Sequence, residues 1–227
     1  MSHPMCLANK HILFVGEETG VDNAIVNQLM DLGGSVVKYN ELDVNLIESG
    51  IKNIIKEEGS FDGLVFAIVH SDFRPLQFVK PDGVNKIMND NFATFIEIVR
   101  SLKKNKGLNK GASIVALSSI SSVRAMKAKM AFCSSKAALD AAVRCLAVEL
   151  APEGIRVNSI QKGSVDADLQ KSHIQNVVAI RDSEETSQQP LGKTSAEEMA
   201  NLVCFLLSDA VKTITGTSIV LDGGYLA

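Results

Sequence analysis

The chain has 227 residues, a net charge of −3 and four scattered cysteines. The length suits one α/β domain or two small ones, and the charge gives no reason to expect general nucleic-acid binding. No apolar run approaches the roughly 18 residues of a membrane span, and residues 1–10 contain no apolar leader. We therefore expect a cytoplasmic protein with reduced thiols, no metal site, and neither nucleic acid nor membrane as a partner.

Short apolar runs alternate with longer amphipathic ones, which predicts βαβ units and a parallel sheet covered by helices on both faces. The predicted strands are residues 11–15, 35–39, 63–69, 113–117, 155–160 and 218–221. The predicted helices are residues 21–32, 46–57, 84–104, 131–150 and 195–208, the last opened by a capping box at Ser195 and Glu198. The polar stretch 170–189 lacks periodicity and is predicted to be a mobile loop.

The helix predicted at residues 131–150 is apolar on almost every side and contains many small residues. A helix that is apolar on several faces must be buried on several faces. It is either enclosed within one subunit or packed on the sheet with its outer face against another subunit. We favour the second interpretation and expect a homodimer or homotetramer.

Several segments carry a family resemblance. Residues 132–136 read Phe-Cys-Ser-Ser-Lys, which resembles the Tyr-x-x-x-Lys signature of the short-chain dehydrogenase/reductase family with the tyrosine replaced. Residues 155–160, 190–193 and 215–224 resemble later segments of the family in the right order, so the resemblance covers nearly the whole chain. It implies a Rossmann-like doubly wound parallel sheet with helices on both faces, formed as a single domain by residues 1–227. It also implies NAD or NADP as cofactor and alcohol–carbonyl interconversion as the reaction.

The resemblance places the four catalytic positions of the family at Asn91, Ser119, Phe132 and Lys136. Ser119 matches the serine that bonds the substrate oxygen. Lys136 matches the lysine that lowers the tyrosine pKa and holds the ribose hydroxyls. Phe132 stands at the tyrosine, and its ring has no hydroxyl proton to give or accept. Three of the four catalytic residues of the family remain, but the missing tyrosine is the residue that transfers the proton.

The turn that holds the cofactor phosphates is also altered. The family pattern Thr-Gly-x-x-x-Gly-x-Gly aligns with residues 15–22, Val-Gly-Glu-Glu-Thr-Gly-Val-Asp. Gly16 and Gly20 are retained, whereas Asp22 replaces the last glycine and Glu17 and Glu18 add negative charge. Such a turn works because a helix N-terminus binds the pyrophosphate. An aspartate in the first helical turn instead stabilises the helix, by about 0.3–1 kcal/mol, and would occupy the same dipole.

Further cofactor positions differ from the family. Asn40 stands where an acidic residue usually binds the ribose, whereas Asp43 matches an aspartate near the adenine. Residues 66–69 replace the usual Asn-Asn-Ala-Gly, and the connection before Asp43 is shorter than usual, which indicates that a helix is absent. The cofactor is NAD or NADP by resemblance, and these changes predict weakened binding or none.

A basic group stands out around the predicted cleft. Three cations lie between Ser119 and Phe132, and two more are expected to face the same cleft: Arg124, Lys127 and Lys129, with Lys136 and Lys162. They are either a solvated charged loop or a site for an anionic small molecule or an acidic protein partner.

Three functions remain open. The leading hypothesis is a pseudoenzyme with a binding or partner role. The alternative is an atypical NAD(P)-dependent oxidoreductase that uses Ser119 and Lys136, with water, His70 or Tyr225 replacing the lost hydroxyl. The third is a lyase or isomerase with Lys136 as base. The survival of Ser119, Lys136 and Asn91 favours the oxidoreductase, although each has a structural explanation: a turn cap, an ion pair and a backbone contact across a helix irregularity.

Overall fold

A six-stranded parallel sheet forms the centre of the molecule, with the strand order β2-β1-β3-β4-β5-β6. The computed structural model describes residues 4–165 and 189–227. The loop predicted at residues 170–189 therefore lies outside the described residues, except for Gln189. The strands are β1 His11–Val15, β2 Ser35–Tyr39, β3 Phe61–Phe66, β4 Leu108–Ser119, β5 Arg156–Lys162 and β6 Ser218–Leu221.

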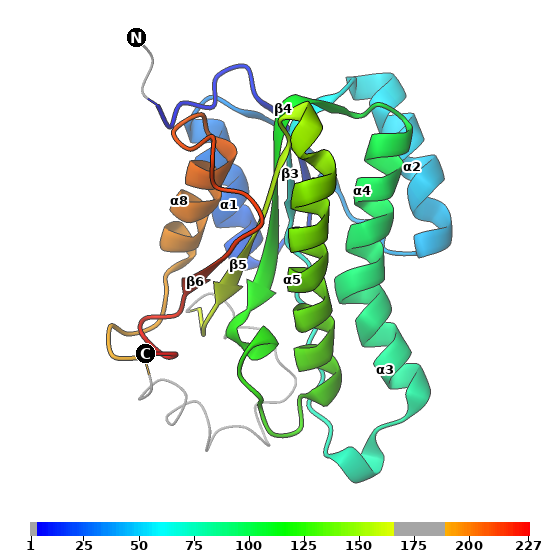
Figure 1. The fold of residues 1–227 in the computed structure, drawn as a ribbon, viewed down its shortest axis with the longest axis vertical. Coiled ribbons are helices and arrows are strands. Elements are labelled where there is room, and N and C mark those ends of the chain that lie inside the picture. Colours follow the sequence, from blue (N-terminus) through cyan, green and yellow to red (C-terminus); the bar gives the residue numbers. More distant parts are fainter. Residues whose placement is uncertain (1–3, 166–188) are drawn as a thin grey trace.

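Helices cover both faces of the sheet (Figure 1). On one face lie α1 (Gly20–Asp31) and α8 (Ala196–Leu207), and on the other lie α2 (Val44–Glu58), α4 (Thr94–Lys104) and α5 (Met130–Leu150). Each face has its own cluster of buried apolar side chains. This arrangement confirms the predicted α/β fold with a doubly wound parallel sheet. None of the helices in the described part of the chain is long and apolar enough to cross a membrane.

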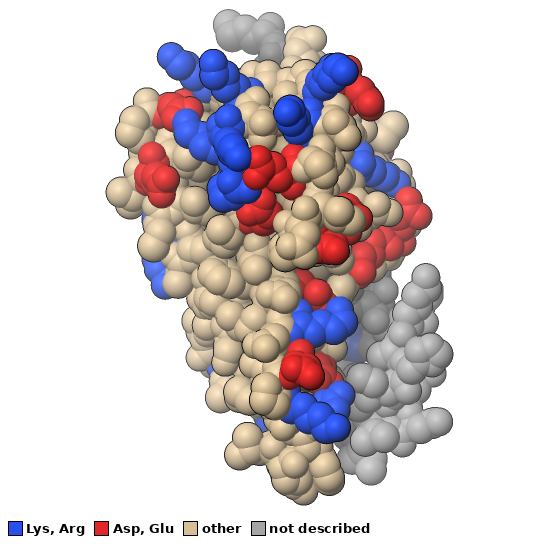
Figure 2. Space-filling model, turned by 90° about the vertical axis from the view of Figure 1, so that its right-hand side faces the viewer, with Lys and Arg blue, Asp and Glu red and all other residues tan. Residues whose placement is uncertain are grey.

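The face formed by α2 and α4 carries interspersed charges (Figure 2). Arg100 of α4 contacts Glu97 on its own helix at 2.6 Å and also pairs with Glu48 of α2. Lys104 pairs with the same Glu48. Because the signs alternate, this face produces no broad field of one sign that would attract a highly charged partner.

The chain reverses direction along the sheet beside β1. Strand β1 pairs with β2 on one side and with β3 on the other, in parallel register on both. In such a sheet the carboxyl ends of the two strands that flank the reversal form a crevice in which ligands bind. The crevice between the ends of β1 and β3 is therefore the place to look for a functional site.

The prediction of one continuous helix at residues 84–104 is wrong, because the helix is interrupted in its middle. The structure contains α3 (Pro81–Met88), a π-helical turn η2 (Asn89–Ala93) and then α4. A π turn inserts one extra residue into the helical repeat, and it recurs at functional sites. Strand β3 also ends at Phe66, three residues earlier than predicted, and Phe66 packs in the core against Phe95.

Candidate functional site

Asp22, in the first turn of α1, turns its carboxylate back onto the loop that follows β1. Its Oδ2 accepts hydrogen bonds from the backbone N–H groups of Glu17, at 2.9 Å, and Thr19, at 3.2 Å. The N–H of Asp22 donates to Thr19 Oγ1, which completes a capping box. Asp22 is only 3% exposed, and this burial raises its pKa although the backbone hydrogen bonds oppose the rise. The capping geometry anticipated for Asp22 is therefore present.

The N–H groups of Glu17 and Thr19 belong to the loop that leads into α1, beside the helix N-terminus where a pyrophosphate would lie. The carboxylate of Asp22 already accepts both of them, so it stands in the place of a phosphate oxygen. Gly16 offers no extra room, because a Cβ there would lie 2.5 Å from the Phe14 ring and 2.9 Å from Asp22 Oδ2. The residues present do not fit a dinucleotide phosphate unless Asp22 moves.

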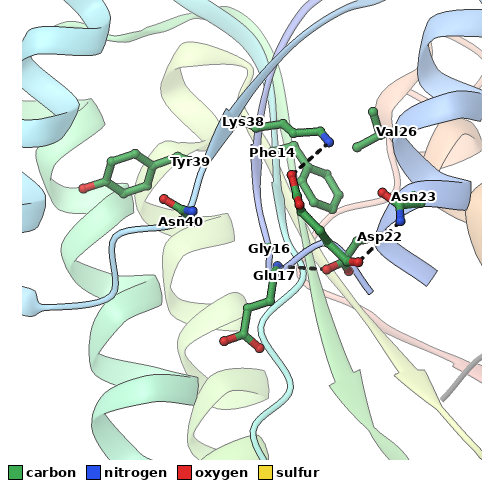
Figure 3. A pocket seen from close by; sticks show the side chains of 10 residues that line it. Phe14, Gly16, Glu17, Asp22, Asn23, Val26, Lys38, Tyr39 and Asn40 are labelled. Atoms are coloured by element: carbon green, nitrogen blue, oxygen red, sulfur yellow. Dashed lines mark hydrogen bonds and ion pairs between the residues drawn. The ribbon is translucent and has the colours of Figure 1, made fainter. Parts of the chain in front are cut away.

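A cavity of about 370 Å³ lies beside this loop, between the carboxyl ends of β1 and β2 (Figure 3). Glu17, Glu18 and Asp22 contribute three carboxylates to its lining, and Lys38 pairs with Glu18 at 3.5 Å. In Figure 3 the Glu17 side chain points away from the other carboxylates. The excess of negative charge opposes the binding of a phosphate group here.

The other residues predicted to bind the cofactor lie in different parts of the structure. Asn40 follows β2 and lines the cavity. Asp43 instead caps α2, where its carboxylate accepts hydrogen bonds from the backbone and the side-chain amide of Asn45, both at 2.9 Å. Residues 40–43 join β2 directly to α2, in accordance with the short connection seen in the sequence. Gly20 is the first residue of α1.

Asn91 is completely buried in the π turn and binds the backbone of His70. Its Oδ1 accepts from the N–H of His70 at 2.9 Å, and its Nδ2 donates to the carbonyl of His70 at 2.7 Å. Nδ2 also lies 3.1 Å from Ser135 Oγ on α5. Asn91 thus fixes the segment that follows β3, across the helix irregularity.

Ser119 and Phe132 lie on two segments that pack together. Ser119 ends β4, and its hydroxyl accepts from the N–H of Ser121 at 3.1 Å, which caps the short helix η3 (Ile120–Ser122). Helix α5 packs against η3. Phe132 is buried in the first turn of α5, and its carbonyl accepts from Ser135 Oγ at 2.8 Å.

Lys136 is completely buried, and its amine binds the main chain. Nζ donates to the carbonyls of Ile68, at 2.8 Å, and Leu117, at 3.0 Å. Burial, and then the charge of Lys162, lower the pKa of Lys136 to about 7, although Asp140 acts in the opposite direction. The expectation that the Lys136 amine faces the cleft is therefore wrong, and it pairs with backbone carbonyls instead of a carboxylate.

Two cations of the predicted basic group contact aromatic rings. The Arg124 guanidinium lies 4.5 Å from the centroid of the Tyr225 ring, and the Lys129 ammonium lies 4.2 Å from that of Phe73. Tyr225 is buried within its own chain. These cation–π contacts distribute the positive charge over separate aromatic residues.

The sequence considered His70 as a proton donor but missed its partners. His70 Nε2 lies 2.8 Å from Glu17 Oε2, and Nδ1 lies 2.8 Å from Asp90 Oδ2. Lys86 Nζ lies 2.6 Å from the same Asp90 oxygen. The spacing of four residues between Lys86 and Asp90 was the one available signal. Within residues 4–165 and 189–227, no group of three His, Cys, Asp or Glu side chains is placed to hold a metal ion.

Comparisons with known proteins place this geometry in a family. A family model described as enoyl-(acyl carrier protein) reductase matches residues 12–226. The D-erythrulose reductase of Gallus gallus is 31% identical over 175 residues, covering 74% of this chain and 68% of that protein. An enoyl-(acyl-carrier-protein) reductase (NADH), FabI, of Buchnera aphidicola is 29% identical over 224 residues, covering 96% and 85%.

The fold of a solved structure supports the same family. The crystal structure of a short chain dehydrogenase family protein from Francisella tularensis has a TM-score of 0.85 and 28% sequence identity. The match covers 96% of this chain and 99% of that one. The chain therefore belongs to the short-chain dehydrogenase/reductase family.

Proposed function

We propose that this member of the family is a cytoplasmic pseudoenzyme with a binding role and with little or no hydride-transfer activity. The observation that carries the proposal is the carboxylate of Asp22, which accepts the loop N–H groups that a pyrophosphate would need. Two further features support it. Phe132 has no hydroxyl at the position of the family tyrosine, and the amine of Lys136 is engaged by backbone carbonyls.

The proposed ligand is an anionic small molecule or an acidic protein partner. Arg124, Lys127 and Lys129 precede α5 and supply the positive charge for such a ligand. Lys136 no longer contributes, because its amine is buried. Cations that lie on aromatic rings keep their charge and still attract an anion.

Titration with NADH and NADPH tests the proposal. The native protein is expected to show no saturable binding up to millimolar concentration by calorimetry. Asp22→Gly is expected to bind at least roughly tenfold more tightly, because it exposes two N–H donors and removes a like charge. Asp31→Gly, at the far end of α1, removes the same charge and serves as the control. Micromolar binding by the native protein, or an equal effect of both variants, would overturn the proposal.

The second candidate is an atypical NAD(P)-dependent oxidoreductase. The names of the relatives favour it, since D-erythrulose reductase and enoyl-(acyl-carrier-protein) reductase are both reductases. This candidate requires saturable NAD(P)H binding and a loss of turnover in Ser119→Ala.

Restoring the tyrosine separates the two candidates. We expect Phe132→Tyr to remain inactive with a panel of aldehydes and ketones, because the hydroxyl is useless without a bound nicotinamide. The measurement is the consumption of NADH and NADPH. Turnover in Phe132→Tyr that disappears in the Phe132→Tyr, Ser119→Ala double variant would favour the oxidoreductase.

The buried amine of Lys136 makes a separate prediction about stability. Its folded-state pKa of about 7 lies below the ordinary value of 10.5, so between these values the unfolded chain binds a proton that the folded chain does not. Stability should therefore rise with pH, by roughly 2 kcal/mol from pH 7 to pH 9 relative to Lys136→Met. Urea unfolding at both pH values measures this difference. The exposed Lys127→Met should follow the native protein, and an unchanged slope in Lys136→Met would refute the assignment.

We also propose that the chain is a homo-oligomer that associates through α5. The outer face of this helix exposes Val148, at 78%, together with Cys145 and Ala137. An exposed apolar helix face of this kind suits an isologous contact with a second copy.

Sedimentation equilibrium tests this association. The native protein is expected to be a dimer or tetramer, and Val148→Arg is expected to shift it to the monomer, because a charge would be buried at the contact. Val123→Arg changes an exposed valine outside α5 and should have no effect. A monomeric native protein at every concentration would rule the interface out.

A further inference from the structure

We propose that Glu17, His70 and Asp90 form a proton-dependent latch across the crevice between the carboxyl ends of β1 and β3. This inference rests on the proposed function, because Glu17 belongs to the same loop whose N–H groups the Asp22 carboxylate accepts. The crevice lies where the strand order reverses, which is where open parallel sheets bind their ligands. A contact that joins the ends of these two strands would lie across the path of such a ligand.

The latch joins the two sides of the crevice. Glu17 belongs to the loop after β1, and His70 belongs to the segment after β3. Their side chains meet with Glu17 Oε2 2.8 Å from His70 Nε2. Figure 3 shows the Glu17 side chain pointing away from the other carboxylates of the cavity beside β2. A ligand that extends from the loop after β1 toward β3 must displace this contact.

His70 is the fixed half of the latch. Asn91 binds both its backbone N–H and its carbonyl, and Asp90 contacts its Nδ1 at 2.8 Å. Lys86 contacts Asp90 in turn, at 2.6 Å. Burial disfavours the charged form of Asp90, but the hydrogen bonds from Lys86 and His70 outweigh burial and lower its pKa. Glu17 is the movable half, since its side chain is 46% exposed and that of Asp90 only 12%.

The geometry requires a protonated His70. Both ring nitrogens face carboxylate oxygens, and only the imidazolium form carries an N–H on each nitrogen. When the ring loses a proton, one of the two contacts becomes a pair of acceptors. Asp90 is held by Lys86, so Glu17 is the partner that leaves. The latch is therefore closed when the His70 ring carries a proton on both nitrogens and open when it carries one.

The charges around His70 also favour the release of Glu17 when the ring loses a proton. With the imidazolium present, His70 and Lys86 balance Glu17 and Asp90; without it, one negative charge is in excess. Asp22, on α1, adds a further carboxylate beside Glu17 and favours its release. Lys136 of α5 also lies nearby, since its amine binds the carbonyl of Ile68 two residues before His70. It lies on the fixed side of the latch.

Nitrogen NMR of the histidine rings and hydrogen exchange test the latch directly. Signals of His70, assigned with His70→Gln, should show both ring nitrogens protonated at about pH 6 and one at about pH 9. Over the same range, the protection factors of the amides of residues 17–19 should fall roughly tenfold or more, as expected for the loss of a charge-assisted hydrogen bond. In Glu17→Gln, the protection factors should be low at both pH values.

Glu18→Gln is the matched control. It makes the same substitution in the same loop, but Glu18 contacts Lys38 and not His70. Its loop should keep the pH dependence of the native protein. A pH-independent protection factor in the native protein, or the same response in Glu17→Gln and Glu18→Gln, would overturn the proposal.

The Asp22→Gly variant separates a failure of the latch from a failure of the proposed function. In this variant, NADH should bind roughly tenfold more weakly at pH 6 than at pH 9, and the added Glu17→Gln substitution should remove the difference. Equal affinity at both pH values would overturn the latch and leave the proposed function intact. No binding by Asp22→Gly at either pH would count against the Asp22 argument, and the hydrogen-exchange result would then decide the latch.

Discussion

The N–H groups of the loop that leads into α1 are satisfied from within the chain, by the carboxylate of Asp22. A helix terminus leaves its first donors without intrahelical partners, and a capping side chain or a bound anion satisfies them. At this terminus the Thr19 hydroxyl accepts the N–H of Asp22, and the Asp22 carboxylate accepts the N–H groups of Glu17 and Thr19 just before the helix. The loop after β1 thereby acquires a defined shape without a ligand. The position of Glu17, and the acidic lining of the adjacent cavity, follow from that shape.

Three residues that the family resemblance assigns to catalysis make contacts that support the fold. Asn91 binds the backbone of His70, and Ser119 caps the turn that follows β4. Lys136 joins the carbonyls of Ile68 and Leu117 at the ends of neighbouring strands. Removing any of them would leave buried backbone groups without a hydrogen-bond partner. These contacts explain why the residues are useful to the protein apart from any chemistry, and they leave Asp22 and Phe132 as the informative departures.

The sequence predicted local features well and long-range contacts poorly. The bounds of β1, β2 and β6 were predicted to the residue, because each is a short apolar run flanked by turn or polar residues. The cap by Asp22 was also predictable, since a capping box spans only four consecutive positions. The direction of the Lys136 side chain was not, because it depends on carbonyls of the segment after β3 and of β4, which lie 68 and 19 positions away in the sequence. The contacts of His70 join three separate segments, and no pattern within one segment reveals them.

The π turn between α3 and α4 sets the rotational phase of the two helices. Ile87 of α3 and Phe95 of α4 are both buried, although they lie eight positions apart. At about 100° per residue, an uninterrupted α-helix would place them roughly 80° apart around its axis. The extra residue of the π turn reduces this offset to roughly 20°, so both side chains face inward. Loss of one residue from Asn89–Ala93 would convert the segment into a regular α-helix with Ile87 and Phe95 seven positions apart, roughly 20° from each other around the axis, so both would stay in the core.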